Sequence, residues 1–217
     1  MRAMLHRKWL RKWLLGTVLV LGLSTHGASS DDGWMPDLHV AAGGQLMFVR
    51  PDDFGLAVHR HQLPVQSTIP PCDEGFDYCL YYLGGQFAGT NFRNAGIRIE
   101  RRDDLETAAS CLSTPPRGYV ELQPVIRRDE GFAVSIFAPL FEGAVGHYAE
   151  GQLYRLALEG GACFEVETRI GAAQFGHFPE GTIREFTRED RDALAARLRD
   201  VVRAIRLVDR PDVVLFE

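Results

Sequence analysis

Short runs in which hydrophobic and polar residues alternate recur through the middle of the chain and predict β-strands. Gly and Pro are spread between these runs, which favours many short strands joined by turns over a bundle of helices. In one run, Ile97 and Ile99 fall on the same face. The predicted strands are Gly44–Val49, Phe76–Leu83, Ala95–Arg101, a segment near Val120–Ile126, and Phe132–Pro139.

The clearest hairpin lies later in the chain. Residues 152–159 and 162–170 flank Gly160-Gly161, a two-residue turn of the type favoured between antiparallel strands. A cysteine falls on the charged face of the second arm, which indicates that the segment bearing Cys111 covers part of this face. The two predicted faces are Phe164, Val166, Thr168 and Ile170, and opposite them Cys163, Glu165, Glu167 and Arg169.

Two helices complete the predicted fold. Asp103 or Asp104 can cap a short central helix that runs to about Leu112. A longer helix follows the capping-box pattern Thr187-x-x-Asp190, and its apolar stripe predicts packing on a sheet. The stripe consists of Leu194, Leu198, Val201, Val202 and Ile205, and the apolar tail Val213–Phe216 could add an edge strand.

The late hairpin and helix carry a family resemblance. The stretch LYRLALEGGACFEVETRI, followed by EFTREDRDALAARLRDVVRAI, resembles the closing hairpin and helix of the PsbP/Mog1/DcrB-like α/β sandwich group over residues 150–207. The resemblance implies an extracytoplasmic protein with this architecture. The group has diverse, mostly non-catalytic roles and no shared catalytic signature. The fold class expected for the chain is α+β: an antiparallel β-sheet with a C-terminal packing helix and one short central helix, stapled by two disulfides.

The first thirty residues have the order of a secretory signal: positive charges, then an apolar run, then small residues. The apolar run Trp13–Leu23 is far shorter than the roughly 20 residues of a membrane-spanning helix. Cleavage is expected after Gly27 or Ser30. The predicted organisation is a signal peptide at 1–30 and a single α+β domain at 31–217, exported to the periplasm or the extracellular space, with no membrane span after cleavage.

Removing this segment changes the charge. Residues 1–30 carry five of the 24 Lys and Arg residues and none of the 29 Asp and Glu residues, so the mature chain has 19 cations against 29 anions, a formal charge of −10. Both lysines, Lys8 and Lys12, are lost with it, which excludes Schiff-base chemistry. Nucleic acid is not an expected partner, because phosphate neutralisation needs a clustered basic face.

The four cysteines all lie in the predicted mature part, where an even count in an oxidising compartment predicts two disulfides. Three connectivities are possible, and we favour Cys72–Cys79 and Cys111–Cys163. The first pair closes a turn-rich loop, and the second ties a central segment to a late strand. A structural zinc site is the alternative, but the close cysteine pairs that it needs are missing.

Few side chains suit nucleophilic catalysis. The chain has no G-x-S-x-G motif and no Gly-rich phosphate loop after a strand, and Ser135 in the apolar run AVSIFA is expected to be a buried strand residue. A divalent metal has one candidate site. Two G-H-aromatic-x-E-G hexapeptides, 146–151 and 176–181, bracket the hairpin, and their convergence would offer a ligand set acceptable to Zn or Mn. These ligands would be His147, Glu150, His177 and Glu180. The alternative is that they mark similar connecting loops.

An aromatic segment is the other candidate site. Tyr78 and Tyr82 share one face of a predicted strand, and Tyr81 lies on the opposite face. Exposed tyrosines beside Asn91 could form a sugar-binding or peptide-binding surface. The favoured alternative is an aromatic core next to a polar loop.

These patterns predict a binding protein or a structural component of the cell envelope, without a cofactor and with an envelope protein or carbohydrate as its partner. Two other functions stay open. One is a metal-dependent hydrolase that uses the paired His/Glu loops. The other is an inhibitor of a secreted enzyme that presents the rigid Cys72–Cys79 loop.

Overall fold

The computed structural model places all the described strands and helices between Asp37 and Leu207. The predicted signal peptide and the tail Val213–Phe216 lie outside the residues that the structure describes. The described residues are 37–41, 45–63, 70–72, 75–116, 123–129, 132–158 and 161–207. Among these residues, no helix is long and apolar enough to cross a membrane.

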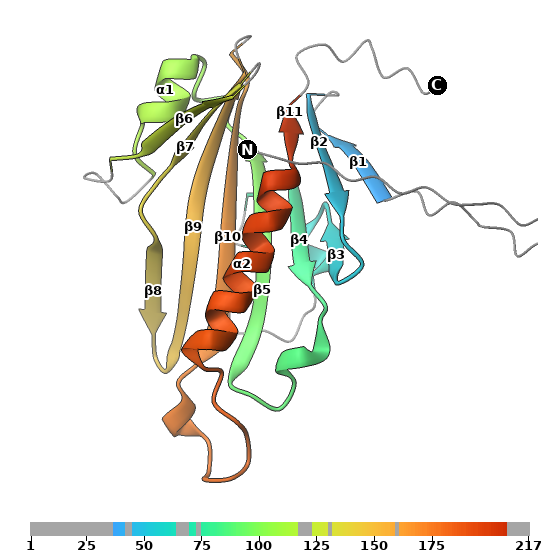
Figure 1. Ribbon diagram of the computed structural model, residues 1–217, viewed down its shortest axis with the longest axis vertical. Helices are drawn as coiled ribbons and strands as arrows, with labels where there is room; N and C mark the ends of the chain where they lie inside the picture. The colour runs from blue at the N-terminus through green and yellow to red at the C-terminus, as the bar shows by residue number, and fades with distance from the viewer. Residues whose placement is uncertain are drawn as a thin grey trace, which may run out of the picture. The chain divides into compact units, whose positions relative to one another are not determined.

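An eight-stranded antiparallel sheet is the centre of the fold (Figure 1). Its two longest strands, β9 (His147–Leu158) and β10 (Cys163–Ala173), are the predicted hairpin. One strand, β8 (Leu140–Ala144), pairs with the first half of β9, and β7 pairs with the second half. Apart from β8, the order of neighbouring strands across the sheet is β3 (Phe54–Ala57), β4 (Tyr78–Tyr82), β5 (Phe92–Arg101), β10, β9, β7 (Phe132–Ile136) and β6 (Val125–Asp129).

A second, three-stranded sheet joins both ends of the described chain. Its order is β1 (Asp37–Ala41), β2 (Leu46–Arg50) and β11 (Arg206–Leu207). The short strand β11 follows directly after helix α2 (Arg188–Ala204). Phe48 of β2 is buried and stands edge-on to Tyr78 of β4, so β2 contributes to the same core as the main sheet.

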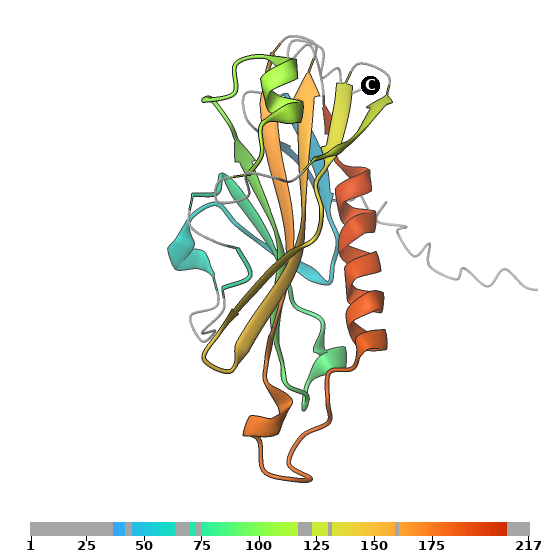
Figure 2. The ribbon, with the colours of Figure 1, turned by 90° about the vertical axis from the view of Figure 1, so that its left-hand side faces the viewer.

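Helix α2 lies along one face of the main sheet (Figures 1 and 2). Thr187 caps its first turn and forms the predicted capping box with Asp190. All five residues of the predicted apolar stripe are buried in one core cluster with Ile97, Ile99 and Phe164 of the sheet. The helix forms and docks because burial of this stripe removes a continuous apolar surface from water.

The opposite face of the sheet is covered in two places, each held by one of the favoured disulfides. Helix α1 (Ala108–Ser113) packs on β9 and β10 and is tied there by Cys111–Cys163, with sulfurs 2.07 Å apart. Cys72–Cys79, with sulfurs 2.01 Å apart, holds a second small apolar cluster on β3 and β4. The expected α+β fold with two disulfides is therefore confirmed.

Several predicted boundaries need correction. Helix α1 is capped by Thr107, because Asp103 and Asp104 instead pair with Arg101 and Arg102. The described part of the strand expected near 120–126 begins at Val125, and residues 117–122 lie outside the described chain. The strands β1, β3 and β8 are not among those that the sequence pattern predicted.

Candidate functional site

The turn between β8 and β9 is the most unusual piece of backbone in the described chain. Val145 has a φ angle of 40° and Gly146 has one of 78°, so both central residues of this two-residue turn are left-handed. Such turns match the twist of a hairpin but normally use Asn-Gly, because a Cβ branch is strained at positive φ. Val145 is the one described residue other than Gly with a positive φ.

A cavity of about 310 Å³ opens beside this turn. Its wall comes from the end of β8, the start of β9 and the segment after β10. We call this cavity and the turn the hairpin-tip site. The lining residues are Gly143, Val145, Gly146, His147, Tyr148 and Gln174.

The two G-H-aromatic-x-E-G segments meet at the hairpin-tip site. The backbone N–H of Gln174 donates to the carbonyl of Gly146 at 2.7 Å. The His177 ring lies against Gly146, and any Cβ on this glycine would overlap it. His147 begins β9, where its Nδ1 is buried and has no hydrogen-bond partner in the structure. Two imidazoles from segments thirty residues apart therefore stand at one end of the sheet.

The two glutamates do not join these histidines as a ligand set. The segment 146–151 is largely strand rather than loop, so His147 and Glu150 point to opposite faces. Glu150 lies 3.8 Å from Arg191 of α2, and Glu180 is exposed on its loop. No group of three or more His, Cys, Asp or Glu residues that could hold a metal ion occurs in the described part of the chain.

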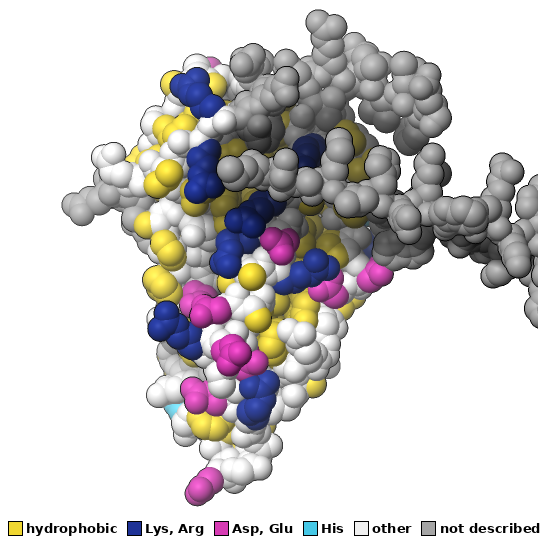
Figure 3. Space-filling view, viewed as in Figure 1, with side chains coloured by type: hydrophobic (Ala, Val, Ile, Leu, Met, Phe, Trp, Pro, Cys, Tyr) yellow, Lys and Arg dark blue, Asp and Glu magenta, His cyan; other side chains and the backbone are white. Residues whose placement is uncertain are grey.

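Exposed hydrophobic side chains surround the hairpin-tip site. Val145 is 97% exposed, Phe141 of β8 is 71% exposed, and Phe175 in the segment after β10 is 40% exposed. Hydrophobic side chains also line the left-hand margin of Figure 3, the side on which Figure 1 draws β8. Binding sites usually combine apolar surface with a small number of polar groups, and here the polar groups include the imidazoles of His147 and His177.

The predicted aromatic surface is mostly packed into the core. Tyr78 and Tyr82 are half-buried and pack on the α2 side, whereas Tyr81 packs against the Cys72–Cys79 cluster. Asn91 is buried, and its side chain links two segments of the backbone. Its amide N–H donates to the Ala173 carbonyl, and its side-chain oxygen accepts from the N–H of Phe186, both at 2.6 Å. The structure thus gives these residues structural contacts.

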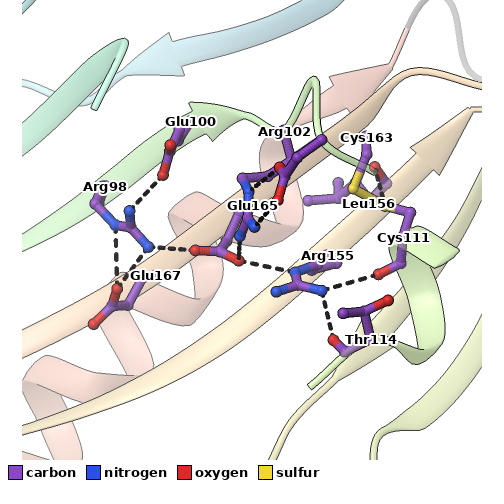
Figure 4. Close-up of polar contacts among 11 residues, drawn as sticks. Arg98, Glu100, Arg102, Cys111, Thr114, Arg155, Leu156, Cys163, Glu165 and Glu167 are labelled. Atoms are coloured by element: carbon purple, nitrogen blue, oxygen red, sulfur yellow. Dashed lines mark hydrogen bonds and ion pairs between the residues drawn. A yellow bond between two sulfur atoms is a disulfide. The ribbon is translucent and has the colours of Figure 1, made fainter. Parts of the chain in front are cut away.

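A buried cluster of charges lies under α1, on the face opposite α2 (Figure 4). Glu165 of β10 is at its centre and accepts hydrogen bonds from Arg98, from Arg102 at 2.7 Å and from Arg155 at 2.8 Å. Arg155 is fully buried, and its Nη1 donates to the Thr114 carbonyl at 2.6 Å. The cluster therefore ties the end of α1 to three strands, next to the Cys111–Cys163 bond.

Burial and pairing have opposite effects on the carboxylates of this cluster. Burial of Glu165 disfavours its charge, but attraction to Arg98 and Arg155 outweighs burial and lowers its pKa. Burial, together with repulsion from Glu165, raises the pKa of Glu100, and these two effects outweigh the attraction of Arg98, 2.6 Å away. Burial likewise lowers the pKa of the Arg155 guanidinium. Each of the three arginines is held by carboxylates or carbonyls, although the buried Nη2 of Arg155 has no hydrogen-bond partner in the structure, and we assign this cluster a structural role.

The serine and cysteine side chains considered as nucleophiles have structural positions. Ser135 is fully buried on β7, as the sequence predicts, and all four cysteines are in disulfides.

Sequence reasoning missed the hairpin tip and Arg155. The available signals were Gly146 between two short alternating runs, and an arginine in the otherwise apolar run LYRLAL.

Comparison with known proteins gives a resemblance in fold. No protein-family model matches the chain, and no curated protein matches it. A solved structure of LpqN, described as involved in cell envelope biogenesis of Mycobacterium tuberculosis, is 12% identical, covers 75% of this chain and 83% of its own, and has a TM-score of 0.41. A mutant of the protein Mog1 is 11% identical, covers 81% and 97%, and has a TM-score of 0.39.

Both proteins belong to the PsbP/Mog1/DcrB-like group that the sequence resembles. Because both TM-scores lie below 0.5, these likenesses carry no argument about the function of this chain.

Proposed function

We propose that this protein is an exported binding protein of the cell envelope that acts without catalysis and contacts its partner at the hairpin-tip site. The observation that carries this proposal is Val145, which is strained at positive φ and also almost fully exposed. Neither property stabilises the fold: the φ angle costs free energy, and the exposed side chain buries almost no apolar surface. Backbone strain of this kind concentrates at functional sites.

The surroundings of Val145 support a protein as the partner. Phe141 of β8 and Phe175, which follows the lining residue Gln174, add exposed apolar side chains to the segments that form the cavity. Exposed apolar patches rimmed by polar groups mark protein contact sites. The setting is an oxidising compartment outside the cytoplasm, which is supported by the leader-like residues 1–30 and by two disulfides and no free cysteine among the described residues.

The test is capture from an extract of the cell envelope with immobilised mature protein. The variant Val145→Asn keeps the turn and removes the apolar group, so we expect it to lose most of the captured partner. The matched control is Leu83→Ser, which removes an exposed leucine that β5 and β10 separate from β9. Equal capture by wild type and Val145→Asn would refute the proposed site.

A further inference from the structure

The hairpin-tip site continues into a free strand edge. In the described part of the chain, β6 pairs with β7 but does not extend along β8, so β8 pairs with β9 alone. Alternate residues of an edge strand direct their N–H and C=O groups outward. Pro139 lacks an N–H, so the edge available for pairing starts at Leu140. The five residues of β8 therefore present unpaired backbone groups directly beside Val145.

Proteins usually protect such an edge with charged residues, but β8 carries only one, Glu142, beside exposed apolar side chains. Phe141, in the strand itself, is 71% exposed. On β6, farther along the same margin of the sheet, Val125 and Ile126 are also exposed. Charged residues, especially lysines, normally prevent exposed edges from pairing. Arg127 and Arg128 provide such charge on β6, whereas β8 has no basic residue. An open apolar edge next to a strained apolar turn is consistent with a surface that is covered when the protein is bound.

We infer that the β8 edge binds an extended segment of a partner protein as an additional antiparallel or parallel strand, with alternating apolar and basic residues. This inference rests on the proposed function and names the chemical class of its partner. Strand addition supplies main-chain hydrogen bonds, and alternate side chains give the specificity.

The side chains of β8 set this pattern. Phe141 lies opposite Glu150 of β9, on the face that carries α2, so an apolar residue of the incoming strand would pack on its ring. Glu142 projects to the other face and is 2.7 Å from Arg169, and the carboxylate is the more exposed member of this pair. A basic residue would complement this carboxylate, and the mature charge of −10 favours the approach of a basic segment.

A second copy of the chain fits this edge less well. Two-fold antiparallel pairing centred on β8 would place Glu142 opposite the same residue of the other copy, and like charges directly opposite are destabilising. Size-exclusion chromatography with light scattering tests this occupant. A dimer of the wild type that Phe141→Ser abolishes would overturn the inference in favour of a second copy.

The main experiment uses synthetic peptides with the mature protein. The probe is an acetylated octapeptide of four Val-Arg repeats. The comparison peptides are four Val-Glu repeats and a Val-Arg peptide with every backbone nitrogen methylated, which removes the donors of both edges. We expect only the unmodified Val-Arg peptide to bind, to slow hydrogen exchange of the β8 amides about tenfold, and to bind Phe141→Ser about tenfold more weakly. Leu83→Ser should bind like the wild type.

The outcomes separate this inference from the proposed function. Equal binding of the N-methylated and the unmodified Val-Arg peptide would overturn strand addition. No peptide binding, together with envelope capture that still depends on Val145, would overturn the inference and leave the proposed function standing. Loss of the dependence on Val145 would refute the proposed function itself.

Discussion

Glu165 shows how single residues hold this fold together. It is 4% exposed, yet its charge is kept because three arginines surround it. Removal of one member of a buried ion pair leaves the other charge uncompensated, which is far more costly than replacing the whole pair. Removal of the Glu165 carboxylate is therefore expected to be strongly destabilising.

The variant Glu165→Gln tests this role. We expect it to lower the free energy of unfolding by about 3 kcal/mol at neutral pH, because Arg98, Arg102 and Arg155 then lose a shared carboxylate. Glu167→Gln is the matched control on the same face, and it should cost about 1 kcal/mol, since Glu167 lies at the edge of the cluster, 3.0 Å from Arg98. Denaturant titration measures both values, and equal losses would contradict the central role of Glu165.

The difference in stability between the wild type and Glu165→Gln depends on pH. The pKa of Glu165 is lower in the folded protein than its ordinary value, so its stabilisation is present above the ordinary carboxyl pKa and is lost as pH falls through the lowered value. The difference in stability between wild type and Glu165→Gln should therefore shrink below about pH 4. A difference that stays constant down to pH 2 would show that the carboxylate charge is not what stabilises the cluster.

At the scale of elements, the two disulfides differ in the segment that they hold and in how much they stabilise the fold. Cys111–Cys163 spans 52 residues and holds the six-residue helix α1, whereas Cys72–Cys79 spans seven. A helix of six residues is too short to persist in water without such support. The longer loop also gains more from closure, about 4 kcal/mol against about 2.5 kcal/mol in the chain-entropy model.

Replacing each cysteine pair by alanine tests this difference. We expect the Cys111→Ala/Cys163→Ala protein to unfold at lower denaturant than Cys72→Ala/Cys79→Ala, and hydrogen exchange in 108–113 to lose its protection first. The reverse order of stability, or unchanged protection of α1, would show that the buried charges hold the helix without the disulfide.

The elements that could be predicted are those whose sequence shows a clear turn signal or a regular alternation of core-facing and solvent-facing residues. The β9–β10 hairpin and α2 were predictable, because two glycines mark the turn and a capping box precedes a regular apolar stripe. The strand β8 was missed, because LFEGA contains an exposed phenylalanine and a glycine and so lacks the alternation of a half-buried strand. Its conformation depends on pairing with β9, which is a tertiary contact.

The candidate site was predictable only in part for a similar reason. The repeated motif correctly drew attention to the segments of His147 and His177, which the structure brings to one end of the sheet. Their glutamates were expected beside them, but strand alternation turns Glu150 to the opposite face. The strain at Val145 depends on a turn type that only the paired strands determine.

At the scale of the whole molecule, the proposed export has a direct chemical signature. Cleavage after Gly27 or Ser30 would remove both lysines and leave the α-amino group as the only primary amine. An amine-reactive ester should therefore add a single label to the protein isolated from its native source, as measured by intact mass. Three labels per chain would show that Lys8 and Lys12 are retained and would contradict cleavage.

The central claim is that the hairpin tip is maintained for binding at the expense of stability. The most direct measurement compares Val145→Asn with Val145→Ile, in both the free energy of unfolding and the amount of envelope partner captured. Asn relieves the strain, so we expect it to raise the unfolding free energy by about 1 kcal/mol and to lose capture. Ile should retain both the strain and the capture. An Asn variant that is more stable and captures as much partner as the wild type would contradict the account.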